Sequence, residues 1–355
     1  MSEYGKLESI RIKGIAIICM YVLHFFAHPD WILAENMYRT LTPWGAVILP
    51  MLSNFGHICV ALFAFTSGYA MYIQREKYAH LQYRICKCFT FLIQYWFVIA
   101  AFMLYGFLAG ETMPDIPTFL MQSVGIGTDI YAQGLNVCTA WYVFFFLVFV
   151  LLHPILIKLS VKNFVIDSFL TFIVLYGGAI IVTKQPFIDI PHTISRFFER
   201  FGLWGSIGLI GYLFAKYQIF KQVNGYLNKK ISTAILVFLS VAIIPTMMII
   251  RSICGNIAIT DIIYAPILIY AVNILLNQIR QPWIESCLKI LAKYSMYMWF
   301  LHSIFFTPNN SLQWLAYWPK YPFLILIWTL FLTLSISKVF HECYTQLESL
   351  FRKIK

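Results

Sequence analysis

The chain has 355 residues, of which 60% are hydrophobic and only 12% are charged, and its mean hydropathy is +0.74. This composition excludes an ordinary soluble domain and indicates an integral membrane protein. The formal net charge of +11 does not indicate a nucleic-acid-binding protein, because the basic residues are scattered between apolar runs instead of gathered in one patch.

Ten apolar segments are long enough to cross a bilayer. They lie at residues 14–31, 55–74, 88–109, 138–157, 164–183, 201–215, 232–250, 257–276, 290–306 and 321–341. The sixth is short, and we expect it to begin earlier, within residues 194–200. The sequence therefore predicts an all-α integral membrane protein with about ten transmembrane helices. We expect one transmembrane domain over residues 1–355, with no appended soluble domain.

Lysine and arginine counts in the loops predict the orientation of these spans. With the N-terminus inside, the cytoplasmic loops and termini hold 20 such residues and the outer loops hold 6. Positive residues favour the cytoplasmic side, so both termini are expected there. The first apolar run resembles a signal peptide, but it contains His24, His28 and Pro29 and lacks a small-residue cleavage site. We therefore expect it to remain as an uncleaved first span.

The eight cysteines lie mostly in apolar segments and form no CxxC pair. Reduced, buried thiols are expected, and the sequence indicates no metal site.

Lys13 and His24 are the ionisable residues that stand out in the first span. Eleven residues at about 100° each come to roughly 20° past three turns, so the two side chains share a helix face. The rise between them is about 16 Å, which places His24 near mid-membrane if Lys13 marks the cytoplasmic surface. An ionisable group at that depth is costly and marks a functional candidate.

Four further motifs follow in order along the chain. They are LFAFTSGY at residues 62–69, RICK at 84–87, AWYV at 140–143 and YSMYMWFLH at 294–302. Together with the spacing of residues 13–24, they resemble the signature of the acyltransferase-3 family, membrane enzymes that modify surface glycans and other acceptors using acyl-CoA. The resemblance extends from residue 11 to about residue 304. It departs from the family at Lys13 and Lys87, where arginine is usual, so the bidentate fork of arginine is lost at both positions.

The resemblance implies catalysis by His24. An imidazole can take the proton of a sugar hydroxyl while that oxygen attacks a thioester carbonyl, so His24 is the expected general base. Lys13 on the same face is expected to steady the histidine or the thiolate leaving group. A packing role for His24, and a snorkelling, orientation-setting role for Lys13, remain alternatives.

Donor binding is assigned to the cytoplasmic surface, because coenzyme A carries several phosphate charges and resides in the cytoplasm. Arg84 and Lys87, three residues apart, share a helical face and are expected to bind it, with Ser67 at the inner end of the second span close by. Orientation charge for the basic pair and small-residue helix packing for Ser67 are the alternatives.

Acceptor binding is assigned to the outer half of the protein. Trp141 and Tyr142 are expected to stack on a sugar ring, with an aromatic belt as the alternative. Ser295 and His302, two helical turns apart, share a face, and His302 is expected near the outer surface, away from the thioester. Its alternative is a hydrated interfacial histidine. Asp261 lies deep in the eighth span and is a candidate charge partner for a histidine or for Lys13.

These observations favour a membrane O-acyltransferase, most simply an O-acetyltransferase, of the cytoplasmic or inner membrane. It would move an acyl group from cytoplasmic acyl-CoA to a hydroxyl of an exported or surface polysaccharide or its lipid-linked precursor, without a metal. The expected partners are membrane lipids, the glycan and polysaccharide biosynthesis proteins, and no nucleic acid. A rival function is export of a polysaccharide or small solute without chemistry, although repeated halves of the transporter kind are not found in the sequence.

Overall fold

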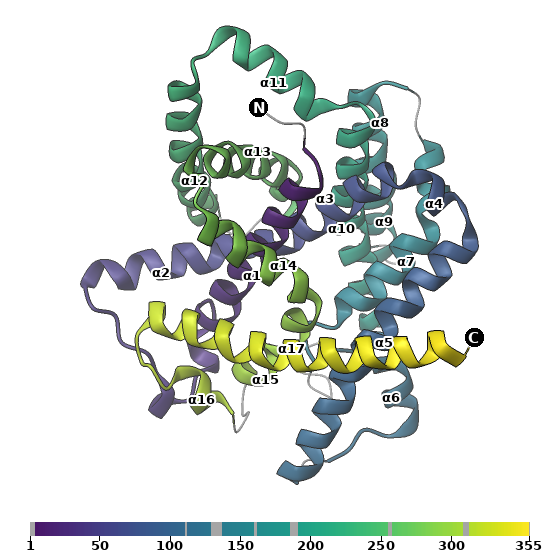
Figure 1. The fold of residues 1–355 in the computed structure, drawn as a ribbon, viewed down its shortest axis with the longest axis vertical. Helices are drawn as coiled ribbons and strands as arrows, with labels where there is room; N and C mark the ends of the chain where they lie inside the picture. The colour runs from purple at the N-terminus through teal and green to yellow at the C-terminus, as the bar shows by residue number, and fades with distance from the viewer. Residues whose placement is uncertain are drawn as a thin grey trace. The chain divides into compact units, whose positions relative to one another are not determined.

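In the computed structural model, the described residues are 4–110, 112–128, 137–159, 162–184, 191–254, 258–307 and 312–354. Within these ranges every regular element is helical, and none is a strand (Figure 1). The prediction of an all-α protein is confirmed for this part of the chain.

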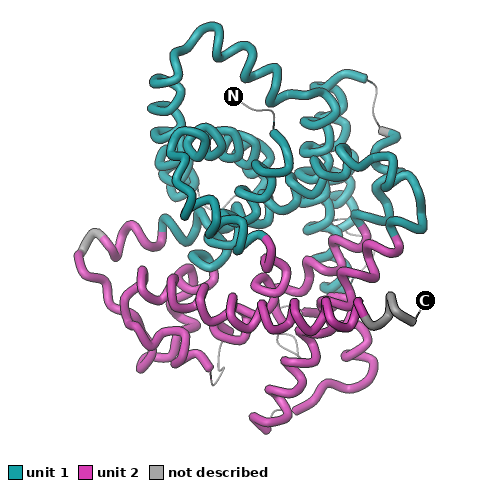
Figure 2. Tube along the Cα trace, in the orientation of Figure 1, with its two compact units in different colours: residues 1–23, 51–84, 149–292 teal, residues 24–50, 85–148, 293–355 magenta. Residues whose placement is uncertain are grey.

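The helices group into two compact units (Figure 2). Unit 1 contains residues 1–23, 51–84 and 149–292, and unit 2 contains residues 24–50, 85–148 and 293–355. Five helices contribute residues to both units, namely α1 (Lys6–Phe26), α2 (Pro43–Gly56), α5 (Leu81–Ala109), α7 (Trp141–Leu156) and α14 (Pro282–Leu301). Each unit therefore draws its residues from three separate stretches of the chain.

Unit 1 is built around α3 and α10. Its other helices are α4, α8, α9, α11, α12 and α13, and α8 continues through a π-helical turn at Ile173–Gly177 into α9. Helix α10 packs against α3, α8 and α9, while α13 packs against α3 and α12. The bounds are α3 (Ile58–Ile73), α4 (Arg75–Ala79), α8 (Phe164–Phe172), α9 (Gly178–Lys184), α10 (His192–Lys216), α11 (Ile219–Lys230), α12 (Thr233–Cys254) and α13 (Asp261–Ile279).

Glycines let α3 and α10 approach each other closely. A Cβ atom at Gly68 would lie 1.7 Å from the carbonyl oxygen of Gly208, and one at Gly211 would lie 2.1 Å from the carbonyl oxygen of Phe65. Small residues at a helix crossing bring the two backbones into van der Waals contact, which stabilises helix pairs where lipid removes the hydrophobic driving force. Gly68 therefore has a packing role.

Unit 2 contains α6 (Ile116–Gln122), α15 (Ser303–Phe306), α16 (Gln313–Tyr317) and α17 (Pro322–Ile354) together with its parts of the five shared helices. Tyr95 of α5 packs against Phe300 of α14 at 5.0 Å between ring centroids, and its hydroxyl donates to the carbonyl of Gln122 at 3.0 Å. Trp328 of α17 donates its indole N–H to the carbonyl of Leu315 at 2.8 Å, which joins α17 to α16.

Each of the ten expected spans coincides with a helix or with two consecutive helices. In the described residues, seven segments are long and apolar enough to cross a membrane: 6–26, 45–73, 81–109, 164–184, 233–254, 258–279 and 322–349. Helix α7 is a shorter apolar helix, and α10, which contains the sixth expected span, begins at His192, close to the start expected within residues 194–200. The chain is therefore a multi-pass membrane protein, and the count of ten and the cytoplasmic termini stay predictions.

Gly68→Ala tests the α3–α10 crossing. The added methyl group would meet the Gly208 backbone, which cannot rotate away as a side chain would. We expect the variant to lose about 1–3 kcal/mol of stability, seen as a lower unfolding midpoint in detergent. Gly225→Ala on α11 is the matched control, because no heavy atom lies within 4 Å of its Cβ position. Equal midpoints for the two variants would contradict the close crossing.

Candidate functional site

Two histidines from opposite ends of the chain meet in unit 2. His24 lies in the last turn of α1, and His302 lies between α14 and α15. Their ring centroids are 4.9 Å apart, and His302 is fully buried. The Nδ1 atom of His302 lies 3.2 Å from the carbonyl oxygen of Met298. Because a carbonyl only accepts, this hydrogen bond assigns the proton to Nδ1 and leaves Nε2 as an acceptor when the ring is neutral.

Aromatic rings surround the two histidines. Phe306 stacks on His24 at 4.6 Å and an interplanar angle of 19°, and its ring centroid is 5.1 Å from that of His302. Trp31 faces the same phenylalanine at 6.5 Å. Such ring contacts restrict the orientation of an imidazole, so the His24 ring is held in place by its packing.

Gln313 forms hydrogen bonds to the backbone of the segment that follows α1. Its Nε2 donates to the carbonyl of Trp31 at 2.8 Å, and its Oε1 accepts from the backbone N–H of Leu33 at 2.8 Å. The Gln313 side chain is fully buried. A buried amide that uses both its donor and its acceptor fixes the backbone it binds. Sequence reasoning missed this residue, because a glutamine outside the apolar segments carries no local signal of a contact about 280 residues away.

His28 lies two residues after the end of α1. It stacks on Trp31 at 3.9 Å between ring centroids, so His28 packs as an aromatic ring.

His302 is buried and its ring neighbours that of His24, so the alternative of a hydrated histidine is wrong. Its place near the outer surface stays a prediction. Helix α14 ends at Leu301 and a separate turn of helix, α15, begins at Ser303, so His302 lies between the two. Ser295 lies two turns earlier on α14 and is half-buried.

Tyr142 and Trp141 lie at the start of α7, against α14. The Tyr142 ring lies 5.0 Å from that of Trp299, and Trp141 lies 5.9 Å from Tyr142. Two hydrogen bonds fasten this contact: the Trp299 indole donates to the Thr139 carbonyl at 3.2 Å, and the Thr139 hydroxyl donates to the Trp299 carbonyl at 3.1 Å. Since Trp299 is three residues before His302, the start of α7 is joined to the turn of α14 that precedes the histidine.

The expected donor-binding residues lie on two helices, α5 and α3. Arg84 and Lys87 both lie on α5, in units 1 and 2 respectively. Within unit 1, the Arg84 Nη1 donates to the Leu151 carbonyl at 2.5 Å. Ser67 is half-buried on α3, beside the crossing with α10. Part of the Arg84 guanidinium is therefore used within the protein.

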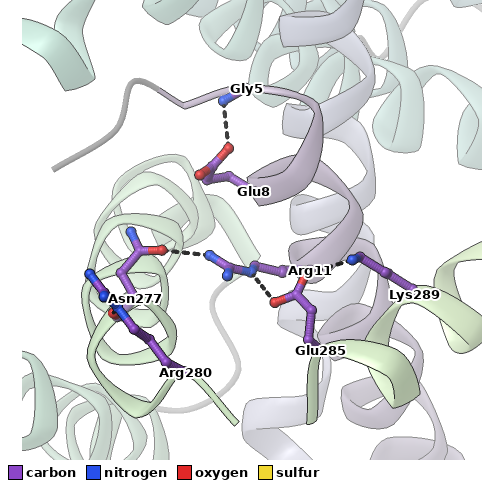
Figure 3. A network of polar contacts seen from close by, with 7 residues as sticks. All are labelled: Gly5, Glu8, Arg11, Asn277, Arg280, Glu285 and Lys289. Atoms are coloured by element: carbon purple, nitrogen blue, oxygen red, sulfur yellow. Dashed lines mark hydrogen bonds and ion pairs between the residues drawn. The ribbon is translucent and has the colours of Figure 1, made fainter. Parts of the chain in front are cut away.

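Arg11 contacts two other helices, although the sequence indicates only a positive charge on the cytoplasmic side. It is buried, and its guanidinium lies between α13 and α14 (Figure 3). Its Nε pairs with the Glu285 carboxylate at 2.8 Å, and its Nη1 donates to the Asn277 side chain at 2.7 Å. Lys13, two residues later, is half-buried. Arg11 thus joins α1 to α13 and α14.

Asp261 is paired with Arg251. The two side chains form a fully buried ion pair, with Nη1–Oδ1 at 2.5 Å and Nη2–Oδ2 at 3.3 Å. The end of the apolar run at residue 250 predicts an outer-loop position for Arg251, but α12 extends to Cys254 and contains it. The charge partner of Asp261 is therefore Arg251, ten residues earlier, which the hydropathy pattern places outside the membrane.

The described residues contain no group of three or more His, Cys, Asp and Glu side chains arranged to hold a metal ion. The expectation of a reaction without a metal stays a prediction.

Comparison with known proteins decides the family. The model of the acyltransferase-3 family, described as an acyltransferase domain, matches residues 9–341. The chain belongs to the acyltransferase-3 family. No curated protein and no solved structure matches. The match covers nearly the whole chain, so this family member is a multi-pass membrane acyltransferase, and its motif residues 13–24, 84–87 and 294–302 all lie inside the match.

The Arg251–Asp261 pair yields a stability prediction. Arg251→Met or Asp261→Asn alone leaves one buried charged group without its partner, and we expect each to cost about 3–5 kcal/mol. The double variant Arg251→Met/Asp261→Leu should recover most of this loss, because neither charge then remains. Unfolding midpoints in detergent measure both effects. Lys184→Met is the control, since the Lys184–Glu199 pair is exposed and should contribute little. Single variants as stable as the control would contradict the prediction.

Proposed function

We propose that this acyltransferase is an O-acetyltransferase that takes the acetyl group of cytoplasmic acetyl-CoA and transfers it to a hydroxyl group of a glycan. The acceptor is an exported or surface polysaccharide, or its lipid-linked precursor, at the cytoplasmic or inner membrane. Membrane lipids surround the enzyme, and polysaccharide biosynthesis proteins supply the acceptor.

The observation that carries this proposal is the contact between His24 and His302. A hydroxyl group is a poor nucleophile until its proton is removed, and imidazole is the side chain best suited to take that proton near neutral pH. The two rings are 4.9 Å apart within an aromatic wall. A packed wall holds a general base in one orientation and reduces competition by water for the acyl group.

In the proposed reaction His24 removes the proton of the acceptor hydroxyl. The resulting oxygen forms a bond to the thioester carbonyl carbon, the bond from that carbon to sulfur breaks, and the coenzyme A thiolate takes up the proton from His24. Products are the acetyl ester and free coenzyme A. A relay in which His24 first holds the acetyl group gives the same products in two steps.

The other predicted residues have supporting roles in this proposal. Arg84 and Lys87 bind the phosphates of the donor, with Ser67 close to it, and Lys13 stabilises the leaving thiolate. Arg84 is partly buried, and its guanidinium has donors beyond the one used on Leu151.

Acceptor binding is assigned to Trp141, Tyr142, Ser295 and His302. The contact of Tyr142 with Trp299 supports this, because Trp299 lies in the last turn of α14, three residues before His302. Aromatic faces are suitable surfaces for the apolar faces of sugar rings.

His24→Ala tests the proposed base. We expect transfer of labelled acetyl from acetyl-CoA to glycan, in membranes that contain the variant, to fall at least about 100-fold. His80→Ala is the control, since His80 is exposed at the end of α4 and should transfer at the normal rate. Transfer by His24→Ala at the normal rate would refute the mechanism. Proton NMR of surface glycans from cells with and without the gene identifies the acceptor ester.

His302→Gln tests acceptor binding. We expect the KM for the glycan acceptor to rise about tenfold or more, with the KM for acetyl-CoA unchanged, because a hydrogen bond to the acceptor is weakened. Steady-state kinetics with each substrate varied in turn measures this. A fall in kcat with both KM values unchanged, accompanied by an altered pH–rate profile, would contradict acceptor binding.

A further inference from the structure

His153 is a buried histidine near the end of α7 that the proposed reaction does not use. It lies in unit 1 and is 2% exposed, and its ring packs against Tyr212 of α10 at 5.1 Å and Tyr78 of α4 at 5.8 Å between centroids. Among the described residues, neither of its ring nitrogens has a hydrogen-bond partner. A buried polar atom without a partner is rare and destabilises the folded state. Because a phenylalanine could pack in the same place without that loss, packing alone does not account for a histidine here.

Arg84 is the charged neighbour of this histidine within unit 1. It is close enough for its charge to act on the His153 ring, and its Nη1 donates to the carbonyl of Leu151, two residues before His153. Pro154 lies inside α7, and a proline inside a helix kinks it and loosens the carbonyls of the preceding turn. The Leu151 carbonyl, three residues before this proline, thereby becomes accessible to a side chain of another helix. Arg84 therefore contacts α7 beside His153.

The hydrogen-bonding groups of Arg84 and His153 complement each other. The Nε of Arg84 is buried and has no hydrogen-bond partner within the described part of the chain. A guanidinium has only donors, whereas a neutral imidazole has one donor nitrogen and one acceptor nitrogen. The unpaired Nε–H group of Arg84 can therefore donate to the unpaired acceptor of His153.

Both residues are expected on the side of the membrane where coenzyme A resides. The sequence predicts that residues 75–87 and residues 158–163 form cytoplasmic loops. His153 lies five residues before the second of these loops, a rise of about 8 Å along a helix. This location agrees with a role toward the donor and not toward the acceptor.

We propose that His153 positions Arg84 for the phosphates of acyl-CoA by accepting a hydrogen bond from the Arg84 Nε. A rotation of the guanidinium toward His153 releases Nη1 from the Leu151 carbonyl. Both Nη atoms then face one phosphate group as a bidentate pair, which strengthens binding and fixes its geometry. His153 acts through Arg84 and does not touch the donor, so it is a positioning residue. This assignment rests on the proposed binding of the donor phosphates by Arg84.

His153→Phe separates positioning from packing. The ring is retained and two unpaired nitrogens are removed, so the unfolding midpoint in detergent should not fall. The affinity for coenzyme A, measured by calorimetric titration of the full-length protein in detergent, should fall about tenfold, because the hydrogen bond to the charged guanidinium is lost. The KM for acetyl-CoA should rise by about the same factor, with kcat and the KM for the glycan unchanged. Unchanged affinity for coenzyme A would overturn the proposal and leave His153 as a packing residue.

Arg84→Met shows whether the effect of His153 passes through Arg84. With the guanidinium removed, His153→Phe should cause no further loss of affinity for coenzyme A. Losses that add in the double variant would overturn the positioning role. If His153→Phe does not fold, His153→Leu gives the same comparison, because leucine also lacks an acceptor.

His192→Phe is the matched control, because His192 is exposed at the start of α10. It should bind coenzyme A with the wild-type affinity. An equal loss of affinity in this control would show a general effect of replacing a histidine and would contradict the assignment to His153.

Binding and acetyl transfer are measured separately, so this proposal and the proposed function can fail independently. Coenzyme A binding that depends on His153, in a wild-type protein that transfers no acetyl group, would contradict the proposed function alone. Acetyl transfer with a KM for acetyl-CoA that does not depend on His153 would contradict the positioning role alone.

Discussion

The position of α1 depends on contacts that leave no space for a side chain. A Cβ atom at Gly14 would lie 2.6 Å from the carbonyl oxygen of Leu288, and one at Gly56 would lie 2.5 Å from that of Cys19. Arg11 adds an ion pair to Glu285 on α14, the helix that also carries Leu288. In a bilayer, close packing and buried polar contacts hold helices together, because lipid chains are as apolar as the side chains they replace. Helix α1, which carries His24, is therefore fixed at its beginning by both kinds of contact.

Helix positions were largely predictable because hydropathy is a local property of the chain. Each expected span coincides with helical residues, but the lengths were less accurate: α1 begins at Lys6 and ends at Phe26, and α14 begins at Pro282. The apolar runs did not show where polar residues continue a helix. Arg251 is an example, since a single arginine after an apolar run resembles a loop charge until its partner is known. Removing it from the outer loops increases the predicted charge asymmetry.

The candidate site was predictable only in part. His24 stood out because it is ionisable within an apolar run, and that property can be read from a few neighbouring residues. Its contact with His302 could not be read in this way, since it depends on the end of α14 at Leu301 and on packing between residues almost 280 positions apart. Gln313 was missed for a related reason. Its importance comes from burial and hydrogen bonding, and glutamine is common in many other settings.

The wall around His24 has a consequence for the synthesis of the protein. His302 and Phe306 contact this histidine, and the Tyr317 hydroxyl donates to the carbonyl of the adjacent Phe25 at 2.9 Å. A ribosome adds about 5–20 residues per second, so roughly 15–60 s separate the emergence of His24 from that of Tyr317. During this interval the His24 imidazole lacks its contacts with His302 and Phe306. His24 therefore gains its aromatic neighbours only when the last fifth of the chain has been synthesised.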